Sequence, residues 1–241
     1  MAYTKDRQIQ ITPDIESVDP SNLESTFQSK CTAFQKELFP KPPQSQDPLW
    51  EGYTPSTAWN WPNLTQIELA EACSPKISST TPGPDEITHN IIVKAYQAIP
   101  DIFFKLYSKL IKIGYHPKSW KQANIAILPK PGKPDYSKPK AYRLISLLNC
   151  LEKVNERIIV KRLSYLAEIT HLLYSNQIGG RLKKSAINAI ILLNSKIEQN
   201  FKNKLKTLAL FLNIKEAFNY IIKNRLIQIL QNLKLLINLI K

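Results

Sequence analysis

The residues of this chain that are best suited to chemistry are five cations in one proline-rich loop, PKPGKPDYSKPKAYR, residues 129–143. They are Lys130, Lys133, Lys138, Lys140 and Arg143. Proline restricts the loop, so these side chains would lose little further chain entropy on binding, and Lys and Arg are common partners of phosphate groups. We therefore expect the loop to lie over a bound triphosphate. The alternative is a basic loop that is only solvated and binds nothing.

A second stretch, TLALFLNIKEAFNYI, spans residues 207–221 and has the pattern of an apolar strand that runs into a helix. A strand end of this kind is well placed to present a carboxylate to a metal ion, but this one carries Asn213 and Asn219. Mg²⁺ prefers charged oxygen ligands, and an amide carbonyl contributes no negative charge. The stretch therefore has the form of a metal site without its acidic ligand.

The charge of the chain is distributed unevenly. Its formal net charge is +14, and residues 76–241 hold 28 Lys or Arg against 9 Asp or Glu. Residues 1–75 hold only 5 basic residues against 10 acidic ones. A strongly basic region makes polyanions, above all RNA or DNA, its expected partner, and a basic surface without a partner is the alternative.

The organisation changes along the chain, because all 17 prolines stand at or before Pro139. We expect an acidic, proline-rich lead and linker over residues 1–62, poorly ordered over residues 1–21, and one domain over residues 63–241. Three widely spaced cysteines favour neither a disulfide framework nor a metal cluster. No apolar run reaches the roughly 18 residues of a membrane span, and no signal core is present. A soluble intracellular protein without membrane contact is expected.

Apolar periodicity and capping residues predict a mostly helical α+β fold with a small, largely antiparallel sheet. Thr65 and Glu68 have the spacing of a helix cap, and Pro100 and Gly114 stand where a helix would start and end. Helices are predicted over residues 23–38, 65–74, 89–99, 100–113, 149–169 and 184–201 and in the tail after residue 221. Strands are predicted over residues 122–129, 142–148 and 206–212, the first two as a hairpin.

Several motifs occur in the order found in one protein family. Residues 120–166, WKQANIAILPKPGKPDYSKPKAYRLISLLNCLEKVNERIIVKRLSYL, resemble the fingers region of reverse transcriptases from LINE-type, non-LTR retrotransposons. The family pattern there is close to WK-A-LPKPGKPD-P-YRPISLLN-EK-RL. WPNLTQIELAEA and TPGPDEI upstream, and NQIGGRLKKSA and ALFLNIKEAFNYI downstream, are similar to further motifs of the same family. The resemblance covers about residues 60–225.

The resemblance implies a right-hand polymerase fold, of which this chain would hold the fingers and the opening of the palm. It also implies that Arg143 contacts the phosphates of an incoming nucleotide, that Lys130 and Lys133 lie nearby, and that Phe218 blocks a ribose 2′-hydroxyl. The segment that meets template or primer is matched by Gln177, Gly179, Gly180 and Arg181. The structural alternatives are a core position for Phe218 and a plain turn for the glycines.

The resemblance places Asn213 at the first catalytic aspartate of the family. Such polymerases use two Mg²⁺ ions, which stabilise the attacking and the leaving oxygen. The second acidic pair, in the Y-x-DD motif, would follow residues 207–221, and no aspartate occurs after Asp135 in this sequence. We therefore expect a truncated and decayed reverse transcriptase that binds no cofactor and has no polymerase activity. Its ancestral role would be copying element RNA into DNA.

The departures from the family motifs share a pattern that suggests how the decay arose. They are Leu144 for proline, Glu86 and Glu216 for glycine, Asn213 and Asn219 for aspartate, and Ile214 for valine. Each needs only one G-to-A or C-to-T change in the coding DNA, as cytosine deamination would produce. Coding DNA without an excess of such transitions would contradict this hypothesis.

Three classes of function are compatible with these patterns. The first is a reverse transcriptase fragment without activity of its own. The second is a basic module that binds RNA or DNA without catalysis, and the third is an unrelated helical interaction protein whose motifs match by chance. Binding of template or primer would be weak, and the sequence leaves the oligomeric state undetermined.

Overall fold

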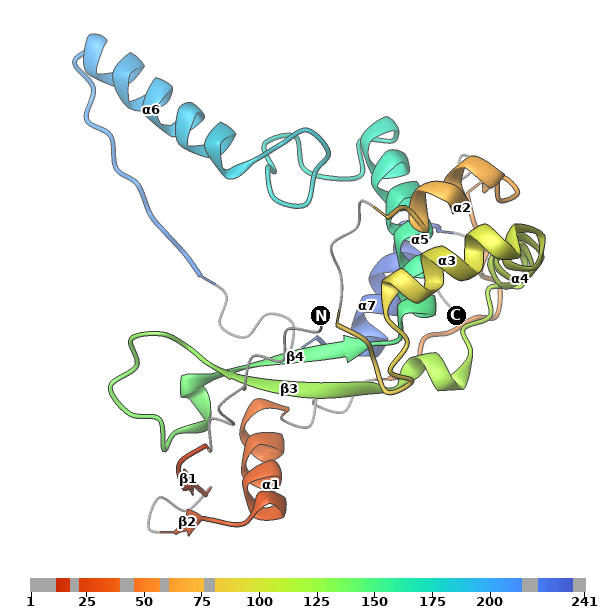
Figure 1. Cartoon of the computed structure of the whole chain (residues 1–241). Coiled ribbons are helices and arrows are strands. Elements are labelled where there is room, and N and C mark those ends of the chain that lie inside the picture. Colours follow the sequence, from red (N-terminus) through yellow and green to blue (C-terminus); the bar gives the residue numbers. More distant parts are fainter. Residues whose placement is uncertain are drawn as a thin grey trace. The chain divides into compact units, whose positions relative to one another are not determined.

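The computed structural model describes residues 12–17, 22–39, 46–56, 61–75, 81–213 and 221–235, and Figure 1 labels its elements. Contacts divide the chain into two compact units. The first unit takes its described residues from Met1–Thr54, Ala123–Leu147 and Glu216–Lys234, and the second from Pro55–Gln122, Leu148–Lys215 and Leu235–Lys241. Each unit has its own buried core.

The second unit is helical. Its elements are α2 (Gln66–Ala72), α3 (His89–Ala98), α4 (Pro100–Ile113), the 3₁₀ helix η1 (Lys118–Lys121), α5 (Cys150–Ile169) and α6 (Ala186–Lys202). The first unit contains β1 (Ile15–Glu16), β2 (Leu23–Glu24), α1 (Phe27–Leu38), β3 (Ala123–Pro129), the 3₁₀ helix η2 (Pro139–Ala141), β4 (Tyr142–Leu148) and α7 (Lys223–Asn232).

The predicted cap of α2 is confirmed. Thr65 Oγ1 accepts a hydrogen bond from Glu68 N at 3.2 Å, and Thr65 N donates to Glu68 Oε2 at 3.0 Å. Two amides at the helix start, which have no partner within the helix, are satisfied by this exchange. The helix ends at Ala72, before Pro75, as the sequence predicts.

The predicted pair of helices α3 and α4 is also confirmed. Pro100 occupies the first turn of α4, and Gly114 ends it with φ at 65°, a left-handed conformation that glycine adopts without strain. The two helices are in contact, and the edge of Tyr96 meets Phe103 with ring centroids 5.9 Å apart.

The core of the second unit forms where α5 packs against α2 and α3, and Figure 1 shows these helices together with α4. Tyr107 of α4 is completely buried, and its hydroxyl donates to Leu151 O of α5 at 2.8 Å. Its ring lies between those of Phe103 and Trp120, with centroid distances of 6.2 and 6.1 Å. These aromatic contacts connect α4, η1 and α5.

The helix predicted over residues 184–201 is present as α6, but it is not packed like the others. Ser185 caps it, because its Oγ accepts from Asn188 N at 3.4 Å and Asn188 Oδ1 accepts from Ser185 N at 2.8 Å. None of the residues of α6 is buried against the described part of the chain. Local signals therefore suffice to form this helix without burial against the residues that the structure describes.

The first unit is built on the predicted hairpin of β3 and β4, which pair as a two-stranded sheet (Figure 1). Its core contains Ile15, Phe34 of α1 and Tyr142 of β4, with partly buried Leu144 packed against it. Two side-chain contacts fix α7 in the same unit: Asn224 Nδ2 donates to Asp47 Oδ1 at 2.9 Å, and Gln231 Nε2 donates to Leu49 O at 2.8 Å.

The expectation of a poorly ordered segment over residues 1–21 is wrong for the part of it that the structure describes. Ile15 is fully buried, and β1 pairs antiparallel with β2, with Ile15 opposite Glu24. The predicted helix over residues 23–38 starts later, at Phe27, because Thr26 Oγ1 caps it by accepting from Ser29 N at 3.2 Å. The domain boundary between residues 62 and 63 stays a prediction.

The predicted strand over residues 206–212 is wrong. Residues 206–213 form no strand with the described chain, and their apolar side chains are exposed. A strand needs a neighbour for its backbone groups, but the described strands pair only as β1 with β2 and β3 with β4. The expected single sheet is therefore two separate sheets of two strands. No described helix is long and apolar enough to cross a membrane.

Candidate nucleic-acid interface

The loop of the β3–β4 hairpin, which carries the predicted phosphate-binding cations, is anchored to the core of its unit. Lys130 N donates to Ala141 O at 2.8 Å and so closes the base of the loop. The hydroxyl of Tyr136 donates to Lys130 O at 2.9 Å, and that of Tyr142 donates to Tyr136 O at 2.8 Å. Tyr142 is buried edge-on against Phe34, with ring centroids 5.1 Å apart. The loop backbone is therefore held before any ligand binds.

The acidic side of the loop is also fixed. Asp135 Oδ1 accepts from the backbone N and the Oγ of Ser137 at 2.9 and 2.6 Å. These two hydrogen bonds, together with nearby Lys138, hold the pKa of Asp135 below its usual range. Glu16 N donates to Ser137 O at 2.8 Å. Residues of the N-terminal segment thus brace the loop.

Three of the five cations have partners within this unit. Lys130 Nζ donates to Lys140 O at 2.8 Å. Lys138 Nζ lies 3.4 Å from Asp135 Oδ2, and Lys140 Nζ lies 2.5 Å from Glu37 Oε1. Exposed ion pairs of this kind contribute little stability, but they neutralise part of the positive charge that a phosphate would meet.

The other two cations are available to a ligand. Lys133 and Arg143 are exposed, and neither side chain has a hydrogen bond or an ion pair with the residues that the structure describes. Lys133 follows Gly132, whose φ of 72° makes the tight turn that glycine permits. Of the five cations that the sequence predicted to bind phosphate, Lys133 and Arg143 are therefore the two whose side chains have no partner in the described part of the chain. We call them the uncommitted cations of the hairpin.

The residues predicted to meet template or primer lie in the irregular turn between α5 and α6. Gln177 N donates to Tyr174 O at 2.9 Å, and Gln177 Nε2 donates to Gly179 O at 3.0 Å. Gly180 has φ at 74°, whereas Gly179 does not adopt a left-handed conformation, and a Cβ at either would meet nothing within 4 Å. The turn requires glycine at position 180 for its backbone conformation.

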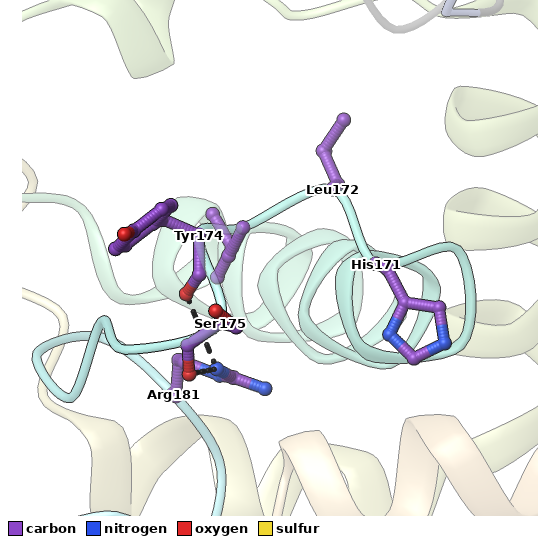
Figure 2. Close-up of a pocket in the computed structure, with 6 residues that line it drawn as sticks. His171, Leu172, Tyr174, Ser175 and Arg181 are labelled. Atoms are coloured by element: carbon purple, nitrogen blue, oxygen red, sulfur yellow. Dashed lines mark hydrogen bonds between the residues drawn. The ribbon is translucent and has the colours of Figure 1, made fainter.

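Arg181 holds this turn together. Its Nε and Nη2 donate to the carboxylate of Glu168 in α5 at 2.9 and 2.5 Å, and Glu168 has a lowered pKa chiefly because of these bonds. Its Nη1 donates to the carbonyls of Tyr174, Ser175 and Gln177 at 3.4, 3.1 and 3.4 Å. Figure 2 shows the guanidinium beside Tyr174 and Ser175. Arg181 is thus a positioning residue of the turn in this structure.

A pocket of about 630 Å³ lies at the same turn, and its six lining residues are drawn in Figure 2. They are His171, Leu172, Leu173, Tyr174, Ser175 and Arg181. Because the Arg181 guanidinium is already bonded to a carboxylate and to carbonyls, the pocket offers little uncommitted positive charge to a phosphate. The hairpin is the stronger candidate for that role.

The remaining predicted site residues lie in the last matched motif. Asn213 is exposed and is the last residue of the described range 81–213. Phe218 lies outside the described residues, so its predicted role at the ribose stays a prediction. In the described ranges, no group of three or more His, Cys, Asp or Glu residues could hold a metal ion. The residues present do not fit the two-metal centre of the family.

The sequence did not predict which residues the turn of the TPGPDEI motif contacts. A Cβ at Gly83 would lie 2.4 Å from Asn149 N, so only glycine lets this turn approach the start of α5. Asn149 Nδ2 donates to Ser119 O at 3.2 Å, and Asn149 Oδ1 accepts from Asp85 N at 3.4 Å. Buried Asn149 therefore joins the motif, η1 and the end of β4. The Pro-Gly-Pro run was the only sequence signal for this contact. It indicated a turn but did not show that the turn packs against Asn149.

Arg162 is the second residue that sequence reasoning missed. Its side chain is 7% exposed, and its Nε and Nη2 donate to the Glu68 carboxylate at 2.7 and 2.8 Å. This bidentate pair lowers the pKa of Glu68 to about 2. The guanidinium also donates to Pro62 O at 2.7 Å and lies 5.1 Å from the ring centroid of Trp61. Trp61 is therefore held to α5 by a cation–π contact.

Comparison with known proteins agrees with the motifs. Residues 128–241 match the family model described as reverse transcriptase (RNA-dependent DNA polymerase). The chain is 33% identical over 153 residues to the probable RNA-directed DNA polymerase from transposon BS of Drosophila melanogaster, covering 63% of this chain and 17% of that protein. Residues 128–241 thus resemble a reverse transcriptase domain, and the chain is similar to RNA-directed DNA polymerases of transposons. The hairpin loop, the turn and Asn213 all lie within the matched reverse transcriptase segment.

Two further proteins that are similar to this chain come from other transposable elements. The probable RNA-directed DNA polymerase from transposon X-element of Drosophila melanogaster is 31% identical over 153 residues, covering 63% of this chain and 17% of that protein. The retrovirus-related Pol polyprotein from the type-1 retrotransposable element R1 of Bradysia coprophila is 37% identical over 102 residues, 42% of this chain and 10% of that protein. The chain thus spans about 17% of the length of the first two relatives.

Proposed function

We propose that this chain holds the fingers and the opening of the palm of a right-hand reverse transcriptase and does not extend a primer. Its ancestral role is the copying of element RNA into DNA. The observation that carries the proposal is Asn213, which lies in the segment matched to the reverse transcriptase model and at the position that the motif order assigns to the first catalytic aspartate.

The chemical argument concerns charge. Nucleotidyl transfer by the intact family uses two Mg²⁺ ions that stabilise the attacking and leaving oxygens. An amide at Asn213 supplies no negative charge to such ions, and no aspartate follows Asp135 in these 241 residues. A loss of about 4 kcal/mol of transition-state stabilisation would slow the reaction roughly a thousandfold.

The purified chain tests the absence of activity directly. Primer extension on an RNA template should be undetectable with Mg²⁺ or Mn²⁺. Restoring Asn213→Asp alone should not rescue it, because one carboxylate does not hold two cations against their mutual repulsion. Templated nucleotide incorporation by the unmodified chain would contradict the proposal.

The alternative function, a nucleic-acid-binding module without catalysis, is favoured by the two uncommitted cations of the hairpin. RNA binding that rests on such charges should weaken steeply with salt, because each phosphate contact releases counterions. The double replacement Lys133→Ala, Arg143→Ala should reduce the slope of log K against log salt by about 2. Lys138→Ala is the matched control, since Lys138 is already paired with Asp135.

The predicted involvement of Lys130 can be tested in the same assay. Its ammonium is bonded to Lys140 O, so Lys130→Ala should change the salt dependence less than Lys133→Ala does. Equal effects of all three lysine replacements would show that the general basic charge of the chain, and not this hairpin, is what RNA meets. Salt-independent or undetectable RNA binding would reject the binding module.

A further inference from the structure

The N-terminal segment, which comprises residues 12–17 and 22–39 of the described chain, packs against the loop of the β3–β4 hairpin. Helix α1 of this segment contacts η2 of the loop, and both belong to the first unit. A pocket of about 240 Å³ lies between them, with Glu16 and Glu37 of the segment and Lys138 and Lys140 of the loop in its lining. Carboxylates of the acidic part of the chain thus meet lysines that the sequence predicted to bind phosphate.

Packing on both sides fixes the ion pair between Glu37 and Lys140. Leu38 follows Glu37 and is 5% exposed, and Ala141 follows Lys140 and is 3% exposed; both lie in the core that also contains Phe34. The two backbones are therefore held together by buried neighbours, so the pair loses less conformational entropy on forming than two unconstrained side chains would. Lys140 Nζ lies 2.5 Å from Glu37 Oε1. A phosphate that approaches Lys140 therefore meets an ammonium that a carboxylate already contacts.

The loop is joined to the same segment at a second point. Ser137 O accepts from Glu16 N at 2.8 Å, and Ser137 Oγ donates to Glu16 Oε1 at 3.3 Å. The strand β1, which holds Glu16, is tied to α1, because Lys30 Nζ lies 3.3 Å from Asp14 Oδ1 and donates to Thr12 O at 2.8 Å. Movement of the loop lysines away from the segment would break these contacts.

We propose that Glu37 lowers the affinity of the hairpin for RNA, because its carboxylate competes with phosphate for Lys140. This inference rests on the proposed binding of RNA by the hairpin. Carboxylate and phosphate oxygens accept the same charge-assisted hydrogen bonds from an ammonium, and the Lys140 side chain is 58% exposed, so RNA has access to it. The acidic N-terminal segment therefore restrains binding by the basic loop and leaves it to the uncommitted cations.

Fluorescence anisotropy of a labelled single-stranded RNA oligonucleotide, titrated with the full chain at several salt concentrations, tests the competition. Glu37→Gln keeps the shape of the side chain and removes its charge, so it removes the competitor of phosphate at Lys140. The affinity at low salt should rise about fivefold, and the slope of log K against log salt should steepen by about 1.

Glu24→Gln is the matched control for this change. It removes the same charge from the same segment, but Glu24 lies in β2 opposite Ile15 and has no ion pair with the residues that the structure describes. Its replacement should leave the slope unaltered and change the affinity less than Glu37→Gln does. Equal effects of the two replacements would overturn the proposal, because the net charge of the chain would then explain both.

A Lys140→Ala background shows whether the effect passes through this lysine. In that background Glu37→Gln should change RNA affinity no more than Glu24→Gln does, and an undiminished gain would contradict the proposal. Circular dichroism of each variant verifies that the fold is retained. Undetectable RNA binding by both the unmodified chain and Glu37→Gln would reject binding by the hairpin itself, whereas RNA binding that Glu37→Gln does not strengthen would overturn only the role of Glu37.

Discussion

The helices α5 and α6 have similar sequence signals and different environments. Both are long and amphipathic, with 20 and 17 residues. Buried residues of α5 include Val154, Ile158 and Leu166, whereas α6 has no buried residue in the described part of the chain. α5 packs against α2 and α3. The difference shows that apolar periodicity creates a face for packing but does not supply the neighbour that covers it.

The largest expected contrast between the two helices is in their charged residues. Arg162→Ala in α5 leaves the Glu68 carboxylate without its bidentate partner and should destabilise the fold by about 3–5 kcal/mol. Lys202→Ala in α6 is the control and should change the free energy of unfolding by less than about 0.5 kcal/mol. Urea denaturation of both variants measures the contrast, and similar effects would mean that α6 is packed as tightly as α5.

The same ion pair makes the stability of the α5 core depend on pH. The pKa of Glu68 is lowered from 4.5 to about 2, so its contribution is fully present above about pH 4.5 and is lost as the pH falls towards 2. Burial raises the pKa of Glu152, so that group contributes in the opposite sense, with stability that is lost as the pH rises. The urea concentration at the midpoint of denaturation should decrease as the pH is lowered below 4.5. This decrease should be smaller in Arg162→Ala than in the unmodified chain. An unchanged pH profile in that variant would contradict the assignment to this pair.

A smaller contrast concerns polar residues on the apolar side of α5. Asn155 is buried, and its Oδ1 has no hydrogen-bond partner among the residues that the structure describes. Asn155→Leu removes the desolvated amide and should stabilise the fold by about 1–2 kcal/mol. Gln199→Leu in α6 places the same side chain at an exposed helix position and should not increase the stability of the fold. Destabilisation by Asn155→Leu would show that the amide has a partner, such as an ordered water.

The smallest expected effect concerns two residues with positive φ. Glu86, at a position where the family motif has glycine, adopts φ of 57°, and Lys183 before α6 adopts φ of 59°. The left-handed conformation costs about 1 kcal/mol for a residue with a side chain. Glu86→Gly should therefore raise the free energy of unfolding by about that amount, less the entropy that glycine adds to the unfolded chain. Lys183→Gly should give a smaller gain, since its turn leads into the unpacked helix.

Much of the fold was predictable because its signals act over a few residues. The cap at Thr65, the start and end of α4 at Pro100 and Gly114, and the β3–β4 hairpin all follow from neighbouring side chains and backbone conformations. The expected strand over residues 206–212 failed for the opposite reason. Its apolar pattern is local, but a strand exists only when another strand pairs with it.

The candidate site divides in the same way. The motif order by itself indicated the resemblance to reverse transcriptases, the basic hairpin and the amide at Asn213, because these are properties of residue type and spacing. Only the tertiary structure decided that Lys133 and Arg143 are the uncommitted cations and that Arg181 braces its own turn. It also decided that Arg162 bonds Glu68, which lies 94 residues earlier in the chain. The physical reason is that such ion pairs form only when segments distant in the sequence pack together. A local sequence pattern does not specify which distant segment will lie beside a given charge.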